Sequence, residues 1–414
     1  MRRVPLLLAA AFLAWACLPG AAAAQVRIGF LAPLTGPQAE AGIALRQGAM
    51  LAVEEINAAG GVTIGGKKEK LELLVEDTTS KPDVGVALGE KLITSDKVHI
   101  LVGDSYASSV TMAVMELAPK YGIPIYSIEP VSGAIAEKVA ANPQRYATYW
   151  KGDFNSDAYA RTVFQTTMDL VKEGKFTPRT KTVAFVVEDT DYGRSNAGDA
   201  AKLFTEVGWK VVATETVPLG HTDFYPQFGK VRGLSPDVVV SCFTSNSSGI
   251  AFAKQYVEQG VSALHLAIYY PTRSEFIPQA GKAAEGILWT PLLFDPENIK
   301  AQVEFAKAIQ EKFLKGTTSK PNSDNAYGYD GIMNIADVLT RAGSLDPKKI
   351  SDAFATLDRR GLLGRYKFDP KNHTVIAGPD YIPVPTAQIQ NGKNVIVWPA
   401  TVKAGEYRTQ PWIR

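Results

Sequence analysis

The residues of this chain that could form a covalent catalyst are a serine in the segment Gly103-Asp104-Ser105 and, far downstream, Asp369 and His373. The order glycine, aspartate, serine occurs in the nucleophile block of some serine hydrolases, where an aspartate and a histidine complete a triad. A serine nucleophile needs a base within hydrogen-bonding distance. However, His99 and His265, two of the four histidines, lie within or beside predicted strands, where structural roles are expected. A secreted serine hydrolase therefore stays a remote alternative, and we do not expect an enzyme.

A second motif, GVTIGGKK at residues 61–68, nearly matches the phosphate-binding loop GxxxxGK[ST]. It fails because Lys68 stands where a hydroxyl would hold magnesium, and because it follows a predicted helix and precedes a predicted strand. We predict a hairpin-like turn there. No group of His, Cys, Asp and Glu has metal-ligand spacing, and no GxGxxG follows the first predicted strand. The sequence therefore predicts neither a metal nor a cofactor.

Polar and aromatic side chains follow nearly every predicted strand. In open parallel sheets, ligands bind outside the carboxyl ends of the strands, so these loops are candidates for one shared site. Any single loop is explained as well by the polarity of loops in general and by helix capping. Taken as a set, they predict a small-molecule site formed by 33–35, 104–109, 129–132, 189–192, 243–246 and 269–272.

The elements that would position these loops alternate between strands and helices. Apolar β-rich runs predict strands at 26–31, 71–76, 99–103, 123–128, 183–188, 210–217, 238–242 and 264–269. Apolar residues at helical spacing predict helices at 84–95, 108–121, 195–207, 250–259, 299–313 and 325–342. The alternation is interrupted by the polar, aromatic segment 143–157. Such a pattern predicts the α/β class, with two doubly wound parallel-sheet lobes.

The N-terminal residues have the pattern of a cleaved signal peptide. A basic start is followed by the apolar segment 4–18, a Pro-Gly break and a run of alanines, so we expect cleavage before Gln25. The apolar core is too short for a good membrane span. A lipid anchor on Cys17 is disfavoured because Trp15 precedes it by two positions. The predicted destination is the periplasm.

Composition excludes some classes of partner and cross-link. The chain has 44 Lys and Arg against 42 Asp and Glu, and loss of two leader arginines takes the net charge from +2 to about zero (+2 − 2). A neutral chain without a basic run has no electrostatic footprint for nucleic acid. Only Cys242 would remain after cleavage, so no internal disulfide is expected. The remaining ~390 residues are enough for two domains with ordinary cores.

Several segments together resemble a known family. IGFLAPLTG at 28–36, GAMLAVEEINAAGGV at 48–62 and DTDYG at 189–193 are similar to periplasmic solute-binding proteins of the branched-chain amino-acid (Leu/Ile/Val) class, the receptors of ABC importers. The resemblance covers essentially all of the mature chain. It implies the type I periplasmic binding protein, or Venus-flytrap, fold. In that fold two lobes are joined by three hinge crossings, here expected near 147–153, 290–292 and 357–361.

The resemblance also implies a division of the chain and a function. After a signal peptide at 1–24, the first lobe would comprise 25–147 with 292–358, and the second 148–291 with 359–414. The expected monomer would capture a small solute by hinge closure and pass it to an ABC permease at the inner membrane. The solute would be amino-acid-like, or an aromatic, carboxylate or amide compound. A ligand-sensing module for a membrane partner is the alternative, because the same fold serves both.

The family's ligand-binding loops map onto named positions of this sequence. Ser108 and Ser109, at a predicted helix start whose amides favour an anion, would hold a carboxylate or carbonyl end together with Pro130 and Ser132. Tyr192 would cover the ligand from the second lobe. The predicted ligand site is completed by Tyr106, Glu129, Trp150, Phe154, Thr244 and Tyr270.

Two positions depart from the family's pattern. Pro130 stands where a backbone N–H is needed, and proline has none. The family's acid for the ligand ammonium would lie in the loop after Ile268, but that loop reads Tyr-Tyr-Pro-Thr. These departures disfavour leucine, isoleucine or valine as the ligand. A small acid or amide, with an aromatic group, is at least as good a candidate.

Overall fold

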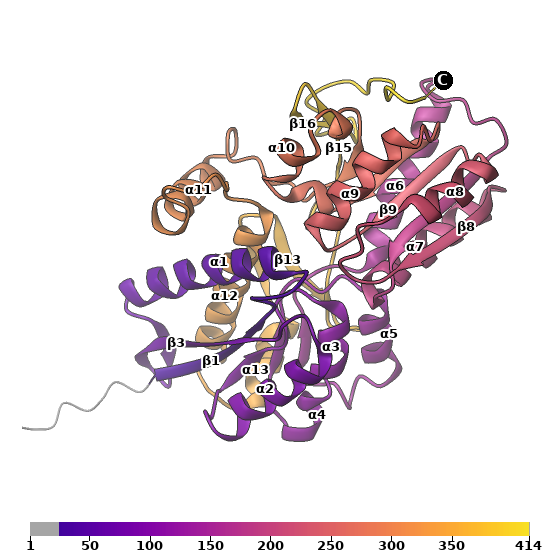
Figure 1. The fold of residues 1–414 in the computed structure, drawn as a ribbon. Coiled ribbons are helices and arrows are strands. Elements are labelled where there is room, and N and C mark those ends of the chain that lie inside the picture. The colour runs from indigo at the N-terminus through magenta and orange to yellow at the C-terminus, as the bar shows by residue number, and fades with distance from the viewer. Residues whose placement is uncertain (1–24, 414) are drawn as a thin grey trace, which may run out of the picture.

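The computed structural model describes residues 25–413, and the predicted signal peptide with Cys17 lies outside them (Figure 1). The chain forms two α/β lobes, each around its own sheet. In Figure 1 the first lobe lies below and the second lies at the upper right. The predicted fold class, two mainly parallel sheets in separate lobes, is confirmed.

The first lobe contains a nine-stranded sheet. Its strands are β1 (Gln25–Ala32), β2 (Val62–Ile64), β3 (Lys67–Asp77), β4 (Ile100–Val102), β5 (Ile125–Ser127), β6 (Tyr149–Lys151), β12 (Asp358–Arg360), β13 (Arg365–Asp369) and β14 (Thr374–Val375). Their order is β12-β13-β14-β6-β5-β4-β1-β3-β2. Pairing is parallel from β14 to β3 and antiparallel at both edges.

The helices of the first lobe are α1 (Ala39–Ala58), α2 (Pro82–Thr94), α3 (Ser108–Val114), α4 (Leu117–Tyr121), α5 (Gly133–Ala141), α11 (Lys300–Phe313), α12 (Ser323–Ala342) and α13 (Pro347–Ala355). Helices α1 and α12 touch through their backbones. A Cβ on Gly48 would lie 1.8 Å from the carbonyl oxygen of Asn325, and one on Gly328 would lie 1.9 Å from that of Leu45. This contact holds the start of α12 against the middle of α1.

The second lobe contains a seven-stranded sheet with an antiparallel edge. Its strands are β7 (Thr182–Glu188), β8 (Lys210–Val217), β9 (Val238–Cys242), β10 (Leu264–Ile268), β11 (Leu288–Thr290), β15 (Thr386–Gln390) and β16 (Lys393–Trp398), in the order β16-β15-β11-β10-β9-β7-β8. Its helical elements are α6 (Ser156–Lys172), α7 (Asp191–Glu206), α8 (Tyr225–Leu234), α9 (Asn246–Glu258), η1 (Tyr270–Thr272), α10 (Phe276–Ala280) and η2 (Gly281–Ala284).

The chain passes between the two sheets three times. The passages lie between β6 and α6, between β11 and α11, and between β14 and β15. The third passage falls at 376–385 and not near 357–361, because β12 and β13 pair with β14 in the first sheet. Residues 359–375, which the sequence-based division gave to the second lobe, are therefore part of the first sheet.

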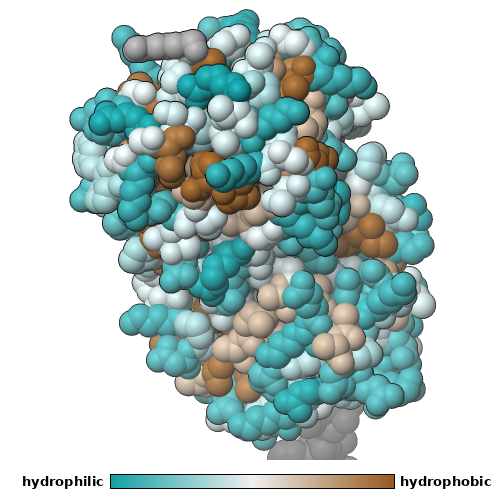
Figure 2. All heavy atoms as spheres, turned by 90° about the vertical axis from the view of Figure 1, so that its right-hand side faces the viewer, coloured by the Kyte–Doolittle hydropathy of each residue, from teal (hydrophilic) through white to brown (hydrophobic). Residues whose placement is uncertain are grey.

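The segment GVTIGGKK forms the predicted hairpin. β2 and β3 pair antiparallel across Gly65 and Gly66, whose φ values of 56° and 79° suit glycine. Figure 2 shows the two lobes one above the other, with a mainly hydrophilic surface and hydrophobic groups gathered on the upper lobe. Within residues 25–413, no helix is both long and apolar enough to cross a membrane.

Candidate functional site

The two lobes meet along the loops that follow the carboxyl ends of their strands. Ser109 Oγ, at the start of α3 in the first lobe, accepts a hydrogen bond of 3.2 Å from the Asp191 amide at the start of α7. Gln38 Nε2, just before α1, donates to Thr244 Oγ1 of the loop after β9 at 2.9 Å. Because these bonds join opposite lobes, the structure is that of a closed molecule.

An ion pair crosses the centre of this interface. Arg273 follows η1 in the second lobe, Asp324 is the second residue of α12, and their side chains are 4% and 0% exposed. The Tyr269 hydroxyl donates to Asp324 Oδ1 at 2.6 Å, and Arg273 Nη2 donates to the Tyr106 hydroxyl at 3.3 Å. The guanidinium carbon lies 5.8 Å from the ring centroids of both tyrosines. Aromatic rings and a neutralised charge pair therefore line the middle of the cleft.

Among the buried polar atoms of the described residues that have no hydrogen-bond partner, four lie just beyond the ends of strands β4, β5, β7 and β9. They come from two loops of each lobe and from residues that are at most 7% exposed: Ser105 Oγ, Glu129 Oε2, Tyr192 OH and Asn246 Oδ1. Buried polar atoms in native proteins are almost always bonded. A molecule bound between the lobes would supply the missing partners.

Three of these residues, Ser105, Glu129 and Tyr192, belong to one neighbourhood. The Glu129 amide donates to the Ser105 carbonyl at 3.0 Å. Tyr106 interacts electrostatically with Glu129 and with Glu188 at the end of β7. Tyr192 in turn interacts with Tyr106. Segments that follow strands of both sheets thus lie close to one another.

The acids around the cleft have unusual pKa values. Burial raises the pKa of Glu129 well above its usual range, and repulsion by Asp324 and Asp153 raises it further. Burial also raises the pKa of Glu188 to about 7, although Thr244 donates its amide and hydroxyl to that carboxylate. The cleft is therefore a dry site with more acidic than basic groups.

The loop after β4 differs from the predicted anion site. Asp104 Oδ1 already accepts hydrogen bonds from the amides of Tyr106 and Ala107, at 2.8 and 2.6 Å. Burial raises the pKa of Asp104 to about 6. Ser108 Oγ, expected to hold a carboxylate, instead accepts from the Ser132 amide at 3.1 Å. Two amides of this loop are thus already occupied by an acid of the protein itself.

Most of the predicted site residues lie at the interface. Tyr106, Glu129 and Tyr192 face the neighbourhood of the unpartnered atoms, and Pro130 is buried beside Glu129. The other predicted residues at the interface make contacts around this neighbourhood. Ser132 bonds to Ser108 as described above, and its Oγ atom lies 2.8 Å from Ser195 Oγ. Ser109 and Thr244 form the bonds between the lobes, and the ring of Phe154 packs edge-on against Tyr159 at 5.1 Å.

Two of the predicted ligand-site residues, Trp150 and Tyr270, lie elsewhere. Trp150 packs in the core of the first lobe, where its indole nitrogen donates to Ser351 Oγ at 3.0 Å and its ring stacks on His373. The Tyr270 hydroxyl bonds to Ser241 at 2.9 Å inside the second lobe. The reason is local: Tyr269, with φ of 65°, turns the chain just before η1, so Tyr269 and not Tyr270 reaches across to the first lobe.

Sequence reasoning placed Ser105, Asn246 and Tyr269 in candidate loops without naming them as ligand-site residues, and it missed Arg273 and Asp324. Arg273 and Asp324 carried a weak signal, a basic residue just beyond a strand-end loop and an acid in the first turn of a helix. Because an acid there usually serves the helix terminus, only the fold shows that it meets Arg273.

Neither catalysis nor a metal centre is supported among the described residues. Ser105 Oγ has no partner, so no base lies within hydrogen-bonding distance, and His373 is stacked on Trp150. Residues 25–413 contain no cluster of three His, Cys, Asp or Glu side chains arranged to hold a metal.

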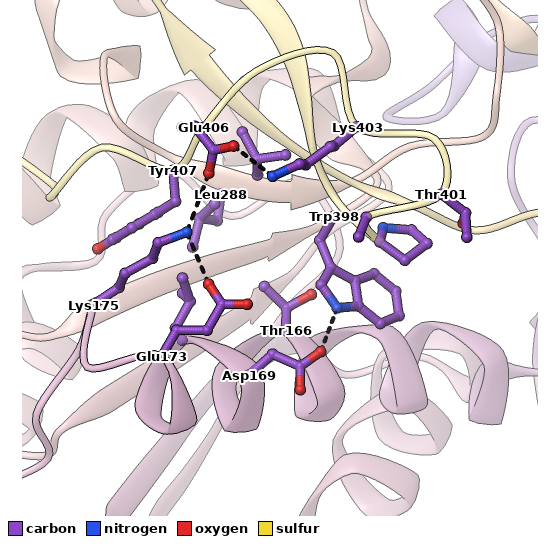
Figure 3. Close-up of a pocket in the computed structure, with 14 residues that line it drawn as sticks. Thr166, Asp169, Glu173, Lys175, Leu288, Trp398, Thr401, Lys403, Glu406 and Tyr407 are labelled. Atoms are coloured by element: carbon purple, nitrogen blue, oxygen red, sulfur yellow. Dashed lines mark hydrogen bonds and ion pairs between the residues drawn. The ribbon is translucent and has the colours of Figure 1, made fainter.

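A separate hollow of about 310 Å³ lies on the second lobe between α6 and the segment after β16 (Figure 3). Its charged groups are paired with one another, whereas the buried Tyr407 hydroxyl has no hydrogen-bond partner. Trp398 Nε1 donates to Asp169 Oδ2 at 2.8 Å, and Lys175 Nζ lies 2.8 Å from Glu173 and 3.2 Å from Glu406. We call this hollow the Trp398 cavity.

Comparisons with known proteins agree with this geometry. Residues 25–393 match the profile of a family described as periplasmic binding protein. The Leu/Ile/Val-binding protein homolog 1 of Brucella abortus is 26% identical over 362 residues, which span 87% of this chain and 90% of that protein.

Two solved structures share the fold. One is a putative branched-chain amino acid ABC transporter protein from Silicibacter pomeroyi, with a TM-score of 0.79 and 24% identity over 94% of this chain and 100% of that one. The other is an ABC transporter solute-binding protein from R. palustris in complex with benzoate, with a TM-score of 0.76 and 20% identity over 94% and 99%. The chain, a two-lobed binding protein and not an enzyme, belongs to the periplasmic binding protein family.

Proposed function

We propose that this protein captures a small solute between its lobes in the periplasm and presents the closed form to an ABC permease. The observation that carries the proposal is the set of four buried, unpartnered polar atoms, two from each lobe. A ligand that bonds to both sets contacts the closed form more extensively than the open one. Binding therefore shifts the population toward closure by the difference in affinity.

The surroundings of these atoms define the kind of solute. Tyr106, Tyr192 and Tyr269 are all at most 7% exposed and come from both lobes. Aromatic side chains provide large apolar contact area with a polar end. The proposed ligand is a small molecule with an apolar or aromatic body and polar groups that reach both lobes. Benzoate, held by the R. palustris protein, and leucine, named for the Brucella relative, are the first probes.

The test begins by removing endogenous ligand through unfolding and refolding, with mass spectrometry of whatever is released. Isothermal titration against amino acids and aromatic acids should then find a ligand of micromolar or better affinity. Asn246→Ala should weaken binding, because it removes an unpartnered acceptor, while Asn142→Ala at the exposed end of α5 in the first lobe should not. Absence of any released or titrated small molecule would contradict the proposal.

A further inference from the structure

Lys151 is a fully buried lysine at a place where the chain passes between the lobes. It is the last residue of β6, is 0% exposed, and stands just before the first passage, residues 152–155. Lysine is almost never fully buried unless it is paired. Ordering its long side chain also costs conformational entropy. The contacts of Lys151 must therefore offset a substantial cost.

The Lys151 side chain reaches forward along this passage. Its Nζ atom donates to the Asp153 carbonyl at 2.9 Å, to the Phe154 carbonyl, and to Asn155 Oδ1 at 3.0 Å. An ammonium group can donate to all three oxygens, and a neutral amine can donate to two of them. In either form, one side chain bonds to successive residues of the passage.

The two ends of the passage are held by different lobes. On the first-lobe side, the Gly152 amide donates to the Ser127 carbonyl at 2.6 Å, and Asp153 Oδ1 accepts from a tyrosine hydroxyl of α12. On the second-lobe side, Asn155 directly precedes α6, which packs against β11 and β15 of the second sheet. The bend between the lobes is therefore confined to the two residues between Asp153 and α6, and Lys151 spans them.

The side chain of Asn155 is directed toward Lys151 and not toward its own helix. An asparagine just before a helix usually caps it by accepting from a backbone amide of the first turn. The Asn155 side chain makes no such bond to α6, and its Oδ1 atom accepts from Lys151 instead. The start of a second-lobe helix is thus tied to the end of a first-lobe strand.

The first passage is also the shortest of the three. It comprises residues 152–155, whereas the other two comprise 291–299 and 376–385. Hinge motion is absorbed by changes of the backbone torsion angles of a few residues between the moving bodies. A short passage has few residues over which to distribute this change. A side chain that fixes its bend therefore constrains the relative orientation of the lobes.

We propose that Lys151 is a positioning residue of the hinge, which holds the first passage in the bend of the closed form by bonding the end of β6 to the start of α6. The inference rests on the proposed function, because the bend matters to binding only if closure traps a solute. Lys151 would act through the orientation of the lobes and not by contact with the solute.

The test measures how much solute is needed to close the lobes. The probe is the extract of small molecules that the unaltered protein releases on unfolding, and it is added back to refolded, solute-free protein. Small-angle scattering follows the radius of gyration. Lys151→Met keeps most of the side-chain length and removes its donors. It should need about 10-fold more extract for half-maximal closure, because the lost hydrogen bonds are those of the closed form.

Two further variants and a second measurement accompany Lys151→Met. Asn155→Ala removes one acceptor and should raise the required amount of extract by a smaller factor, about 3-fold. Lys91→Met is the matched control, because this half-exposed lysine of the first lobe pairs with Glu76 and Asp96 away from the passage. It should close at the same amount of extract as the unaltered protein. Urea unfolding of each variant separates a hinge role from a role in stability alone.

Closure of Lys151→Met at the same or a smaller amount of extract, even with a lower free energy of unfolding, would overturn the inference and leave the proposed function standing. If the unaltered protein is already compact without extract, Lys151→Met should have the larger radius of gyration, and an equal radius would overturn the inference. If Lys151→Met does not fold, Asn155→Ala decides, because unchanged closure in that variant contradicts the proposal. Release of no small molecule would count against the proposed function and, with it, the inference.

Discussion

The cleft between the lobes and the Trp398 cavity are both lined by acids, bases and aromatic rings, yet the pKa values of their carboxyl groups are shifted in opposite directions. In the Trp398 cavity the charged side chains are paired and exposed to solvent. Hydrogen bonds from Lys403 and Lys175 lower the pKa of Glu406, whose side chain is 63% exposed. In the cleft, burial raises the pKa of Glu129 and Glu188. Buried carboxyl groups with raised pKa values, and not empty volume, therefore distinguish the cleft from the Trp398 cavity.

The largest expected effect comes from breaking the buried ion pair at the centre of the cleft. Asp324→Asn leaves the Arg273 guanidinium buried without its counter-ion, at a cost of roughly 3–5 kcal/mol to the closed form. Because the pair joins the two lobes, the variant should relieve this cost by opening. Small-angle scattering should show a larger radius of gyration without ligand, and titration should show affinity reduced by about 100-fold or more.

Asp337→Asn is the control for this prediction. Asp337 lies on the same helix, α12, but forms a half-exposed pair with Arg341. It should leave both the scattering and the affinity unchanged. A ligand-free Asp324→Asn variant as compact as the unaltered protein would show that the pair does not hold the lobes together.

The next prediction compares how an acid in each region makes the free energy of unfolding depend on pH. Burial raises the pKa of Glu188 to about 7. At pH values between the pKa of this side chain in the unfolded chain and 7, the folded protein therefore binds one more proton than the unfolded chain. This contribution to stability is present at low pH and is lost as the pH rises through 7. Between about pH 5 and pH 8, the free energy of unfolding of the unaltered protein should fall by ~2 kcal/mol more than that of Glu188→Gln.

Glu406→Gln provides the comparison from the Trp398 cavity. Since hydrogen bonds from Lys403 and Lys175 lower the pKa of this exposed acid, it should not contribute a loss of stability over the same range. Urea unfolding of all three proteins at both pH values checks the prediction. Parallel pH curves for the unaltered protein and Glu188→Gln would contradict it.

A smaller effect is expected from the unpartnered hydroxyl of Tyr192. Tyr192→Phe should lower ligand affinity by roughly 5- to 10-fold, since it removes one hydrogen bond to the ligand, without loss of stability. Tyr256→Phe should do the reverse. Its hydroxyl donates to the Ala263 carbonyl at 2.9 Å inside the second lobe, so ~1 kcal/mol of stability should be lost with affinity unchanged. Thermal melts and ligand titrations of both variants check this. A loss of stability in Tyr192→Phe, or a loss of affinity in Tyr256→Phe, would contradict the prediction.

The smallest effect is expected at the Trp398 cavity. Lys175→Ala removes an exposed cation that pairs with Glu173 and Glu406. Pairs of this kind contribute at most ~1 kcal/mol, so stability should change little and ligand affinity not at all. A loss of affinity in this variant would indicate that the cavity takes part in binding.

Much of the fold could be predicted because its strands are apolar and buried. β7 and β9 are continuous buried runs, which is typical of parallel sheets covered on both faces. Helix α6 was not predicted. Its buried face consists largely of small and hydroxyl residues such as Ala158, Thr162 and Thr166, which give little hydrophobic signal. The short strands β12 and β14 depend on pairing that the sequence does not display.

The site was predictable loop by loop but not as a set of contacts. The loops containing Ser105, Glu129 and Tyr192 stand out because polar groups follow buried strands. The partner of Arg273, by contrast, comes from a helix 51 residues later in the chain, and only folding brings the two together. The polar bonds made by Trp150 and Tyr270 within the lobe cores were likewise invisible in the sequence.

The most direct test is a crystal structure of the protein with the solute that it releases on unfolding. The account predicts that the solute lies between the lobes, within hydrogen-bonding distance of Glu129 Oε2 and Asn246 Oδ1 and beside the Tyr192 ring. A solute bound in the Trp398 cavity, or on the outer surface of one lobe with the four atoms still unpartnered, would contradict it.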